Sequence, residues 1–171
     1  ALTSGLNTLV DAGVGCIAIP CNTAHYWYDS LVQISQVPIL HIAQACADAL
    51  VQDDVSSVGL LATDGTLKAG FYPRELAARG IALKLPDSTL QQQVMDAIYR
   101  VKSGDVQAGG LILEACMQKM LEAGVERVIL GCTEIPFALD QINSTHRHLG
   151  MDATKALAAA CVQWHWAGQS Q

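Results

Sequence analysis

Two segments of the sequence repeat one another, and this repeat constrains the fold more than any other feature. Residues 9–23 read LVDAGVGCIAIPCNT and residues 120–134 read MLEAGVERVILGCTE. The segments align without a gap at a separation of 111 residues, which brings Cys21 onto Cys132. Ile17 to Ile19 fall on Val128 to Leu130, so apolar residues match apolar residues through this run. Such self-similarity indicates that one structural unit occurs twice in the chain.

Each copy predicts a helix, then a strand, then a second helix. Gly13 and Gly124 follow the first helix, because glycine suits the left-handed position after a helix C-terminus. The runs CIAIP and RVILG are apolar on both faces, which is typical of strands in a parallel sheet covered by helices. Small polar residues that favour helix N-termini follow Cys21 and Cys132. Each cysteine is therefore expected at the carboxyl end of a strand, where open α/β sheets bind ligands.

The rest of the chain alternates predicted strands with predicted helices. We expect strands at residues 55–62 and 81–85, and helices at residues 89–102, 105–123 and 153–166. The predicted fold class is therefore α/β, with parallel sheets in two pseudo-symmetric lobes.

The repeat also predicts how the chain divides between the two lobes. The first lobe, with Cys21, comprises residues 1–52 and 141–171, and the second lobe, with Cys132, comprises residues 53–140. In the second copy 77 residues separate the start of the first strand from the cysteine, whereas only 20 residues precede Cys21. The first lobe is therefore expected to be incomplete at its N-terminus, as in a fragment, a processed or split product, or a degenerate copy.

Composition excludes several classes of function. Apolar residues make up 51% of the chain and charged residues 15%, which suits a buried core rather than disorder. The net charge of −6 and the lack of a lysine or arginine run argue against binding to nucleic acid or to an anionic membrane. No signal peptide and no apolar run long enough to span a membrane are visible. We expect a soluble, cytoplasmic protein.

Six cysteines are present, without a C-x-x-C pair, so neither zinc nor any other metal is expected. In an apolar chain rich in predicted helices, reduced thiols are expected rather than disulfides. Four of these thiols, without polar followers, are interpreted as small core residues: Cys16, Cys46, Cys116 and Cys161.

Cys21 and Cys132 form a pair suited to proton transfer at a stereocentre. A helix N-terminus lowers the pKa of a thiol and binds carboxylates through free N–H groups. Two thiols on opposite sides of one site could remove an α-proton from one face of a carbon and return a proton to the other. The spacing therefore predicts a pair of opposed acid/base groups.

Three segments resemble the aspartate/glutamate racemase family. Residues 19–25 (IPCNTAH) are similar to its first signature, residues 131–135 (GCTEI) to its second, and residues 59–66 (GLLATDGT) to the opening of its second lobe. The resemblance covers nearly the whole chain. It implies two Rossmann-like lobes, amino-acid racemisation without pyridoxal phosphate or any other cofactor, and commonly a homodimer.

The resemblance also implies roles for individual residues. Cys21 and Cys132 would be the catalytic pair. Lys102 would hold a side-chain carboxylate, with a solvated lysine near a helix C-terminus as the alternative. The remaining expected site residues, which would bind the substrate or, for the last of them, orient Cys132, are Asn22, Thr23, Thr63, Thr66, Thr133 and Glu134.

His25 lies one helical turn after Cys21, so it could tune the thiol or simply pack at a helix surface. The aromatic residues 26–28 are expected in packing rather than as a shield over the site.

Several other functions are also compatible with the sequence. Within the same superfamily these are a hydantoin racemase, a maleate isomerase and an arylmalonate decarboxylase, the last needing only one cysteine. A cysteine phosphatase would need an arginine six positions after the cysteine, where Trp27 and Ala138 stand. A cysteine hydrolase would need an activating base, and only His25 is available. A truncated, non-catalytic domain that binds amino acids or forms an interface is the remaining alternative.

Overall fold

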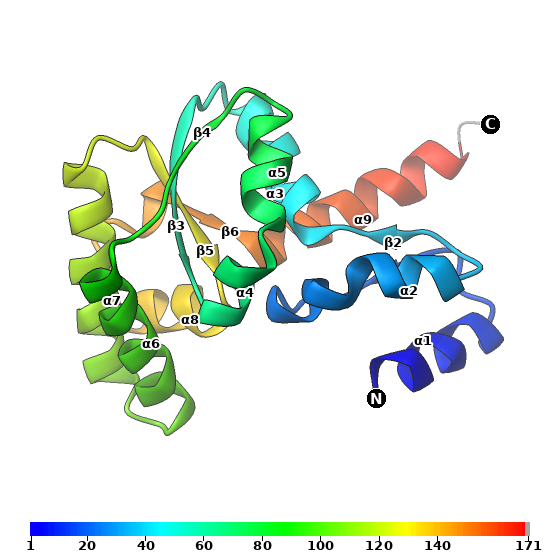
Figure 1. The fold of residues 1–171 in the computed structure, drawn as a ribbon, viewed down its shortest axis with the longest axis horizontal. Helices are drawn as coiled ribbons and strands as arrows, with labels where there is room; N and C mark the ends of the chain where they lie inside the picture. Colours follow the sequence, from blue (N-terminus) through cyan, green and yellow to red (C-terminus); the bar gives the residue numbers. More distant parts are fainter. Residues whose placement is uncertain (170–171) are drawn as a thin grey trace.

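The computed structural model describes residues 1–169 and shows two parallel sheets with helices packed around them (Figure 1). No helix among these residues is long and apolar enough to cross a membrane. The strands are β1 (Ile17–Ala18), β2 (Ile39–Leu40), β3 (Ser57–Ala62), β4 (Ala82–Lys84), β5 (Arg127–Gly131) and β6 (Gly150–Asp152). The helices are α1 (Leu2–Asp11), the 3₁₀ helix η1 (Thr23–Trp27), α2 (Tyr28–Ile34), α3 (Ile42–Gln52), α4 (Asp64–Ala69), α5 (Phe71–Ala77), α6 (Ser88–Lys102), α7 (Val106–Glu122), α8 (Glu134–Gln141), the 3₁₀ helix η2 (Arg147–Leu149) and α9 (Ala153–Gln169).

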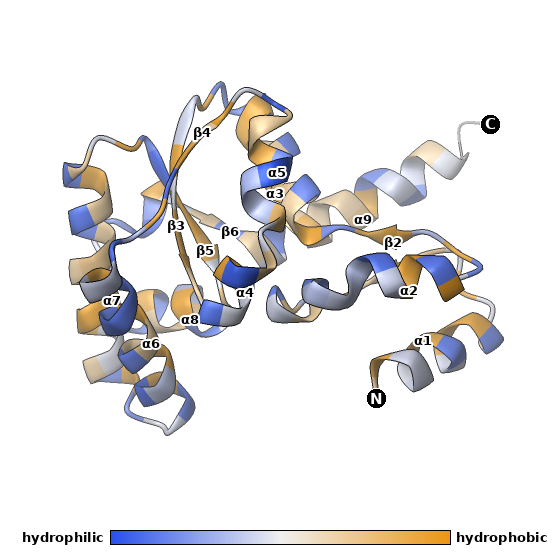
Figure 2. Ribbon diagram, in the orientation of Figure 1, coloured by the Kyte–Doolittle hydropathy of each residue, from blue (hydrophilic) through white to orange (hydrophobic). Residues whose placement is uncertain are grey.

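The larger sheet has the strand order β4-β3-β5-β6, and all its strands are parallel. Its central strands are buried on both faces, as their apolar sequences predict (Figure 2). Leu60 packs with α3, α5 and α9 on one face, while its neighbour Leu61 packs with α6, α7 and α8 on the other. The predicted α/β fold with parallel sheets is confirmed.

The two copies of the repeat have the same strand pairing. In the smaller sheet Ile17 pairs with Ile39. In the larger sheet Val128, the counterpart of Ile17, pairs with Gly150, the counterpart of Ile39. The equivalence extends well beyond the repeat visible in the sequence, because α3 and α9 also begin at equivalent residues.

The helix ends are equivalent as well. α1 and α7 end at equivalent acidic residues, and Gly13 and Gly124 then adopt positive φ angles of 77° and 92°. At the start of α3, His41 accepts a hydrogen bond from the backbone N–H of Ala43. At the start of α9, Asp152 accepts the corresponding bond from the N–H of Thr154. The residues at these helix starts differ in type, but they cap in the same way.

Helices α3 and α9 pack against each other and join the two sheets. The last strand of the larger sheet, β6, leads directly into α9, which also contacts β2 of the smaller sheet. The same two helices, α3 and α9, therefore fix the position of one sheet relative to the other.

Candidate functional site

Cys21 and Cys132 line the same cavity, whose volume is about 160 Å³. This is smaller than the roughly 300–1,000 Å³ of pockets for drug-sized ligands, and suits a molecule of amino-acid size. The cavity lies where β1, β3 and β5 end, as expected for a ligand site in a parallel sheet. Its walls are formed by Pro20, Cys21, Asn22, Thr23, Thr63, Lys102, Gly131, Cys132, Thr133 and Glu134.

The two cysteines reach the cavity from equivalent positions. Cys21 follows β1 and precedes η1, whereas Cys132 follows β5 and precedes α8. The helix after Cys21 begins as a 3₁₀ turn and becomes α-helical only at Tyr28. Asn22 and Thr133 lie at the starts of these helices, as predicted, but neither side chain makes a capping hydrogen bond. Their side chains are thereby left for other contacts.

Glu134 organises the side of the cavity around Cys132. The thiol of Cys132 donates to Oε2 of Glu134 at 2.8 Å, and the hydroxyl of Thr133 donates to the same oxygen at 3.0 Å. Nζ of Lys102 lies 3.8 Å from Oε1 of Glu134. Lys102, the last residue of α6, thus lines the cavity and pairs with Glu134.

These contacts shift the pKa of Cys132 in the direction opposite to the predicted one. Burial, then the hydrogen bond to Glu134 and the charge of that carboxylate, together raise the pKa of the Cys132 thiol to about 12. Burial alone would raise the pKa of Glu134, but hydrogen bonds from Cys132, its own backbone N–H and Thr133 lower it overall. The prediction that a helix N-terminus ionises this thiol is therefore wrong, because burial and the neighbouring carboxylate have the larger effect.

Three threonine hydroxyls form a hydrogen-bonded triangle beside the cavity. Oγ1 of Thr23 lies 2.8 Å from Oγ1 of Thr63 and 3.3 Å from Oγ1 of Thr66, and Thr63 and Thr66 are 3.0 Å apart. Thr23 and Thr63 face the cavity, whereas Thr66 is buried behind them and is not part of its wall. The triangle links the loop after β1 to the loop after β3.

Asn22 is held by a residue that sequence reasoning missed. The hydroxyl of Tyr72, in α5, donates to Oδ1 of Asn22 at 2.6 Å, and both side chains are buried. The sulfur of Cys46 lies 3.7 Å from the same hydroxyl. Tyr72 belongs to no motif and lies 50 residues from Asn22, so the sequence carries no signal for this contact.

His25 supports the loop of Cys21 rather than the thiol itself. Its Nδ1 lies 3.0 Å from the backbone oxygen of Cys21, and its Nε2 accepts from the backbone N–H of Ile42 at 3.1 Å. A neutral ring with the proton on Nδ1 satisfies both contacts. Burial lowers the pKa of His25, which favours this neutral form.

The other candidate residues lie away from the cavity. Cys46 and Cys116 are buried in the core, as expected, but Cys16 and Cys161 are only partly buried, so the core assignment is wrong for these two. Tyr26 and Trp27 are exposed and stack edge to face on each other. Among residues 1–169, no group of three or more His, Cys, Asp or Glu side chains is arranged to hold a metal ion.

Comparison with known proteins identifies the family. The model of the Asp/Glu/Hydantoin racemase family matches residues 1–161. The broad specificity amino-acid racemase RacX of Bacillus subtilis is 28% identical over 99% of this chain and 73% of its own length. A glutamate racemase of Ralstonia pickettii is 30% identical over 91% of this chain, but this covers only 58% of that protein.

The fold is shared with solved racemase structures. The aspartate racemase of Picrophilus torridus superimposes with a TM-score of 0.80 at 27% identity, covering 95% of this chain and 67% of that structure. Together with the match along residues 1–161, this similarity places the chain in the Asp/Glu/Hydantoin racemase family.

Proposed function

We propose that the chain catalyses the racemisation of amino acids without pyridoxal phosphate, with Cys21 and Cys132 as the two acid/base groups. The observation that carries this proposal is that both thiols line one small cavity from equivalent ends of two strands. Family membership supports the reaction type, and the equivalence of the two copies supports opposed positions for the thiols.

The reaction needs one proton to leave the α-carbon and another to arrive on the opposite face. The thiolate of one cysteine takes the α-proton, and the electron pair of the broken C–H bond stays on the substrate next to its carboxyl group. The thiol of the other cysteine then gives its proton to the α-carbon. The product has inverted configuration, and the two sulfurs have exchanged protonation states.

Cys132 starts as the protonated thiol. Because its pKa is raised to about 12, Cys132 serves as the acid for the enantiomer that Cys21 deprotonates. For the opposite enantiomer Cys132 must first lose its proton to the solvent. Glu134 accepts the hydrogen bond from Cys132, and this bond holds the proton on the sulfur and makes its loss harder.

The polar residues of the cavity bind the substrate in this proposal. Asn22, Thr23, Thr63 and Thr133 present hydroxyl and amide groups that suit an amino-acid backbone, while Lys102 offers a positive charge. Thr66 fixes the hydroxyls of Thr23 and Thr63 from behind.

The proposal includes the arrangement of the whole protein. The first lobe would comprise residues 1–52 and 141–171 and the second residues 53–140, with the cavity between them. A cytoplasmic location, which keeps both thiols reduced, and a homodimer belong to the same proposal.

The test is incubation with single enantiomers of aspartate, glutamate and neutral amino acids in D₂O, followed by chiral chromatography and by NMR of the α-position. The unaltered protein should racemise its substrate and introduce α-deuterium. Cys21→Ala and Cys132→Ala should each lower racemisation by about 10²-fold or more, the range for a lost acid/base group. Exchange without inversion should survive in both variants, more slowly in Cys21→Ala, because the remaining Cys132 stays protonated.

The matched control is Cys161→Ala, which removes a partly buried thiol that is not part of the cavity wall. It should keep full activity. Full racemisation by either Cys21→Ala or Cys132→Ala would contradict the two-thiol mechanism. Thermal stabilisation by amino acids without deuterium uptake would favour a binding domain instead.

A further inference from the structure

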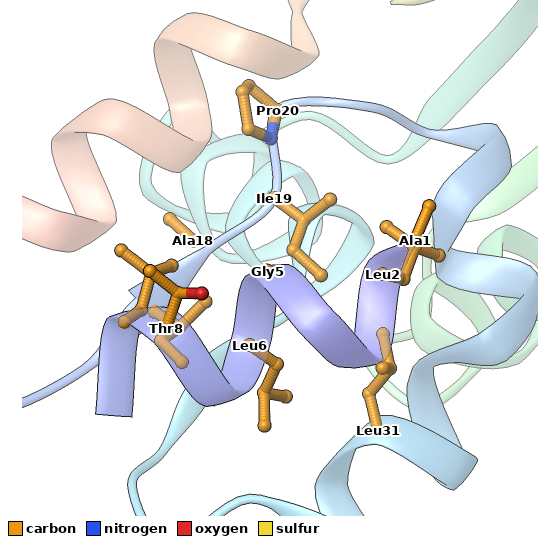
Figure 3. Close-up of a pocket in the computed structure, with 11 residues that line it drawn as sticks. Ala1, Leu2, Gly5, Leu6, Thr8, Ala18, Ile19, Pro20 and Leu31 are labelled. Carbon is orange, nitrogen blue, oxygen red and sulfur yellow. The ribbon is translucent and has the colours of Figure 1, made fainter. Parts of the chain in front are cut away.

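The loop that carries Cys21 has an apolar side and a polar side. On the apolar side Pro20 and α1 line a pocket of about 580 Å³, to whose wall Thr8 contributes the only polar side chain in the described part of the chain (Figure 3). On the polar side Asn22 and Thr23 line the smaller cavity that both cysteines share. The hydrogen bonds available to a molecule beside Cys21 therefore depend on how these two side chains are oriented.

The side-chain amide of Asn22 is bonded at one end and free at the other. Its oxygen Oδ1 lies 2.6 Å from the hydroxyl of Tyr72 in α5, and both residues are buried. Its nitrogen Nδ2 has no hydrogen-bond partner within residues 1–169, and it is not one of the polar atoms that are sealed from solvent without a partner. Because Asn22 forms part of the cavity wall, the two N–H groups of Nδ2 are available to a molecule in the cavity.

The length of the bond to Tyr72 shows which end of the amide faces the core. Hydrogen bonds of the O–H···O type span about 2.5–3.0 Å, whereas those of the N–H···O type span about 2.7–3.2 Å. The observed 2.6 Å lies in the first range and below the second. In the reversed orientation Nδ2 would take the place of Oδ1, and the hydroxyl of Tyr72 would have only the sulfur of Cys46, a weak acceptor, to donate to. The oxygen of Asn22 therefore faces the core.

Cys46, in α3, fixes the direction of this hydrogen bond from behind. Its sulfur lies 3.7 Å from the hydroxyl oxygen of Tyr72. Burial raises the pKa of the Cys46 thiol to about 12 and the pKa of the Tyr72 hydroxyl well above its ordinary value of 10. Both groups therefore keep their protons. The thiol can donate to the tyrosine oxygen, while the tyrosine proton is given to Oδ1 of Asn22.

The equivalent residue of the second copy is held in a different way. Thr133, the counterpart of Asn22, donates its hydroxyl proton to its sequence neighbour Glu134. Asn22 is instead held by a residue 50 positions away, whose side chain is fully buried in the core. The orientation of Asn22 is therefore imposed by the packing of α5 and not by its own loop.

We propose that Tyr72 is a positioning residue, which holds Asn22 with its oxygen toward the core and its N–H groups toward the cavity. The proposal rests on the proposed function, in which Asn22 binds the substrate. Tyr72 is not part of the cavity wall, so it acts only through Asn22. The oriented amide donates to a carboxylate oxygen. An amide that was free to turn would present its own oxygen to that carboxylate for part of the time, which is repulsive.

The first test is Tyr72→Phe, which removes the hydroxyl and keeps the ring in the core. The KM for racemisation should rise by about tenfold, the order expected for one weakened hydrogen bond to a charged group. The kcat should change by less than about twofold, because both thiols are unaltered. In an Asn22→Ala background Tyr72→Phe should raise KM no further, since the group through which it acts is gone. Chiral chromatography gives both constants, and circular dichroism shows that each variant is folded.

Tyr28→Phe is the matched control. It removes a tyrosine hydroxyl that donates to the backbone oxygen of Ile39 at 2.9 Å, outside the cavity wall. Its KM should equal that of the unaltered protein. An unchanged KM in Tyr72→Phe, an equal rise in Tyr28→Phe, or a further rise when Tyr72→Phe is added to Asn22→Ala would each overturn the proposal.

A second test needs no substrate. In ¹⁵N-labelled protein, NMR can follow the exchange of the Asn22 side-chain N–H protons with water, and the signals are assigned by their loss in Asn22→Ala. Exchange as fast as that of other side-chain amides reached by water supports the proposed orientation. Protection of these protons would mean that Nδ2 is bonded to the buried Tyr72, which overturns the proposal. Fast exchange in a protein that racemises nothing would count against the proposed function alone.

Discussion

Residues 2–52 and residues 113–163 follow the same path of helix, strand, helix, strand and helix, but their surroundings differ. The second copy is enclosed, because β3, α6 and α3 cover it. Among residues 1–169, one edge of the strand in the first copy is unpaired, and two leucines of α1 are exposed. The path of the chain is therefore encoded within each copy, whereas burial and the chemistry of each cysteine depend on what the rest of the molecule places beside it.

The largest stability difference between the copies is expected at the counterparts Leu9 and Met120. Met120→Ala should lower the free energy of unfolding by about 2–5 kcal/mol, because it opens a cavity in the core against β3. Leu9→Ala should cost less than about 1 kcal/mol, since this side chain is already exposed to water. Urea denaturation followed by circular dichroism measures both. Equal losses would mean that the first copy is as enclosed as the second.

The cap of the first copy, His41, is an imidazole and should make the protein sensitive to acid. Burial lowers the pKa of His41 to about 4 from 6.5, so the folded protein keeps this ring neutral while the unfolded chain protonates it. Stability should therefore fall between pH 6.5 and pH 4, by at most about 3 kcal/mol from this group. His25, whose pKa burial also lowers, adds to the same trend.

His41→Asn keeps an acceptor for the N–H of Ala43 but removes the titrating ring. The variant should show a flatter dependence of unfolding free energy on pH between 6.5 and 4, whatever its stability at neutral pH. An unchanged slope in His41→Asn would show that this ring is not the source of the acid sensitivity.

A smaller effect, of about tenfold, is expected from Glu134→Gln on the proposed reaction. Burial still raises the pKa of Cys132 in this variant, but the contribution of the carboxylate is lost, so the pKa should fall. The rate for the enantiomer that Cys132 deprotonates should then rise at lower pH than in the unaltered protein. The pH profile for the other enantiomer should stay in place, and both profiles can be read from deuterium uptake.

Glu122→Gln is the control for this change, because it removes an exposed carboxylate that is not part of the cavity wall. Equal displacement of both profiles in Glu134→Gln would mean that Glu134 does not act through Cys132.

The smallest effects are expected at the two glycines that end α1 and α7. Gly13→Ala and Gly124→Ala should each cost about 1 kcal/mol, because alanine is disfavoured at positive φ. The space around both positions is open, so the two costs should be similar. A loss several times larger at one glycine would show that packing there differs between the copies.

Much of this fold follows from local patterns in the sequence. The strands at residues 57–62 and 127–131 and the helices from Ser88 to Glu122 lie close to their predicted bounds, because their apolar periodicity and their glycine signals agree. The pairing of Cys21 with Cys132 in one cavity was also predicted, since the repeat gives both residues the same place at a strand end.

Other features depend on residues far apart in the chain and could not be predicted. The pKa of Cys132 is set by burial under neighbouring elements, which a local helix-terminus argument does not contain. The hydrogen bond between Tyr72 and Asn22 crosses between elements that no motif connects. Leu2 and Leu9 are exposed beside the edge of β1 that no strand among residues 1–169 covers, and no local pattern in the sequence shows this.

The contact between α3 and α9 is a place where one part of the molecule can rotate relative to the other. Each of these helices begins directly after a strand, and each belongs to a different copy of the repeat. A small rolling of one helix on the other would move Cys21 relative to Cys132 while both sheets kept their pairing. The spacing of the two sulfurs thus depends on a helix contact that lies outside the cavity wall.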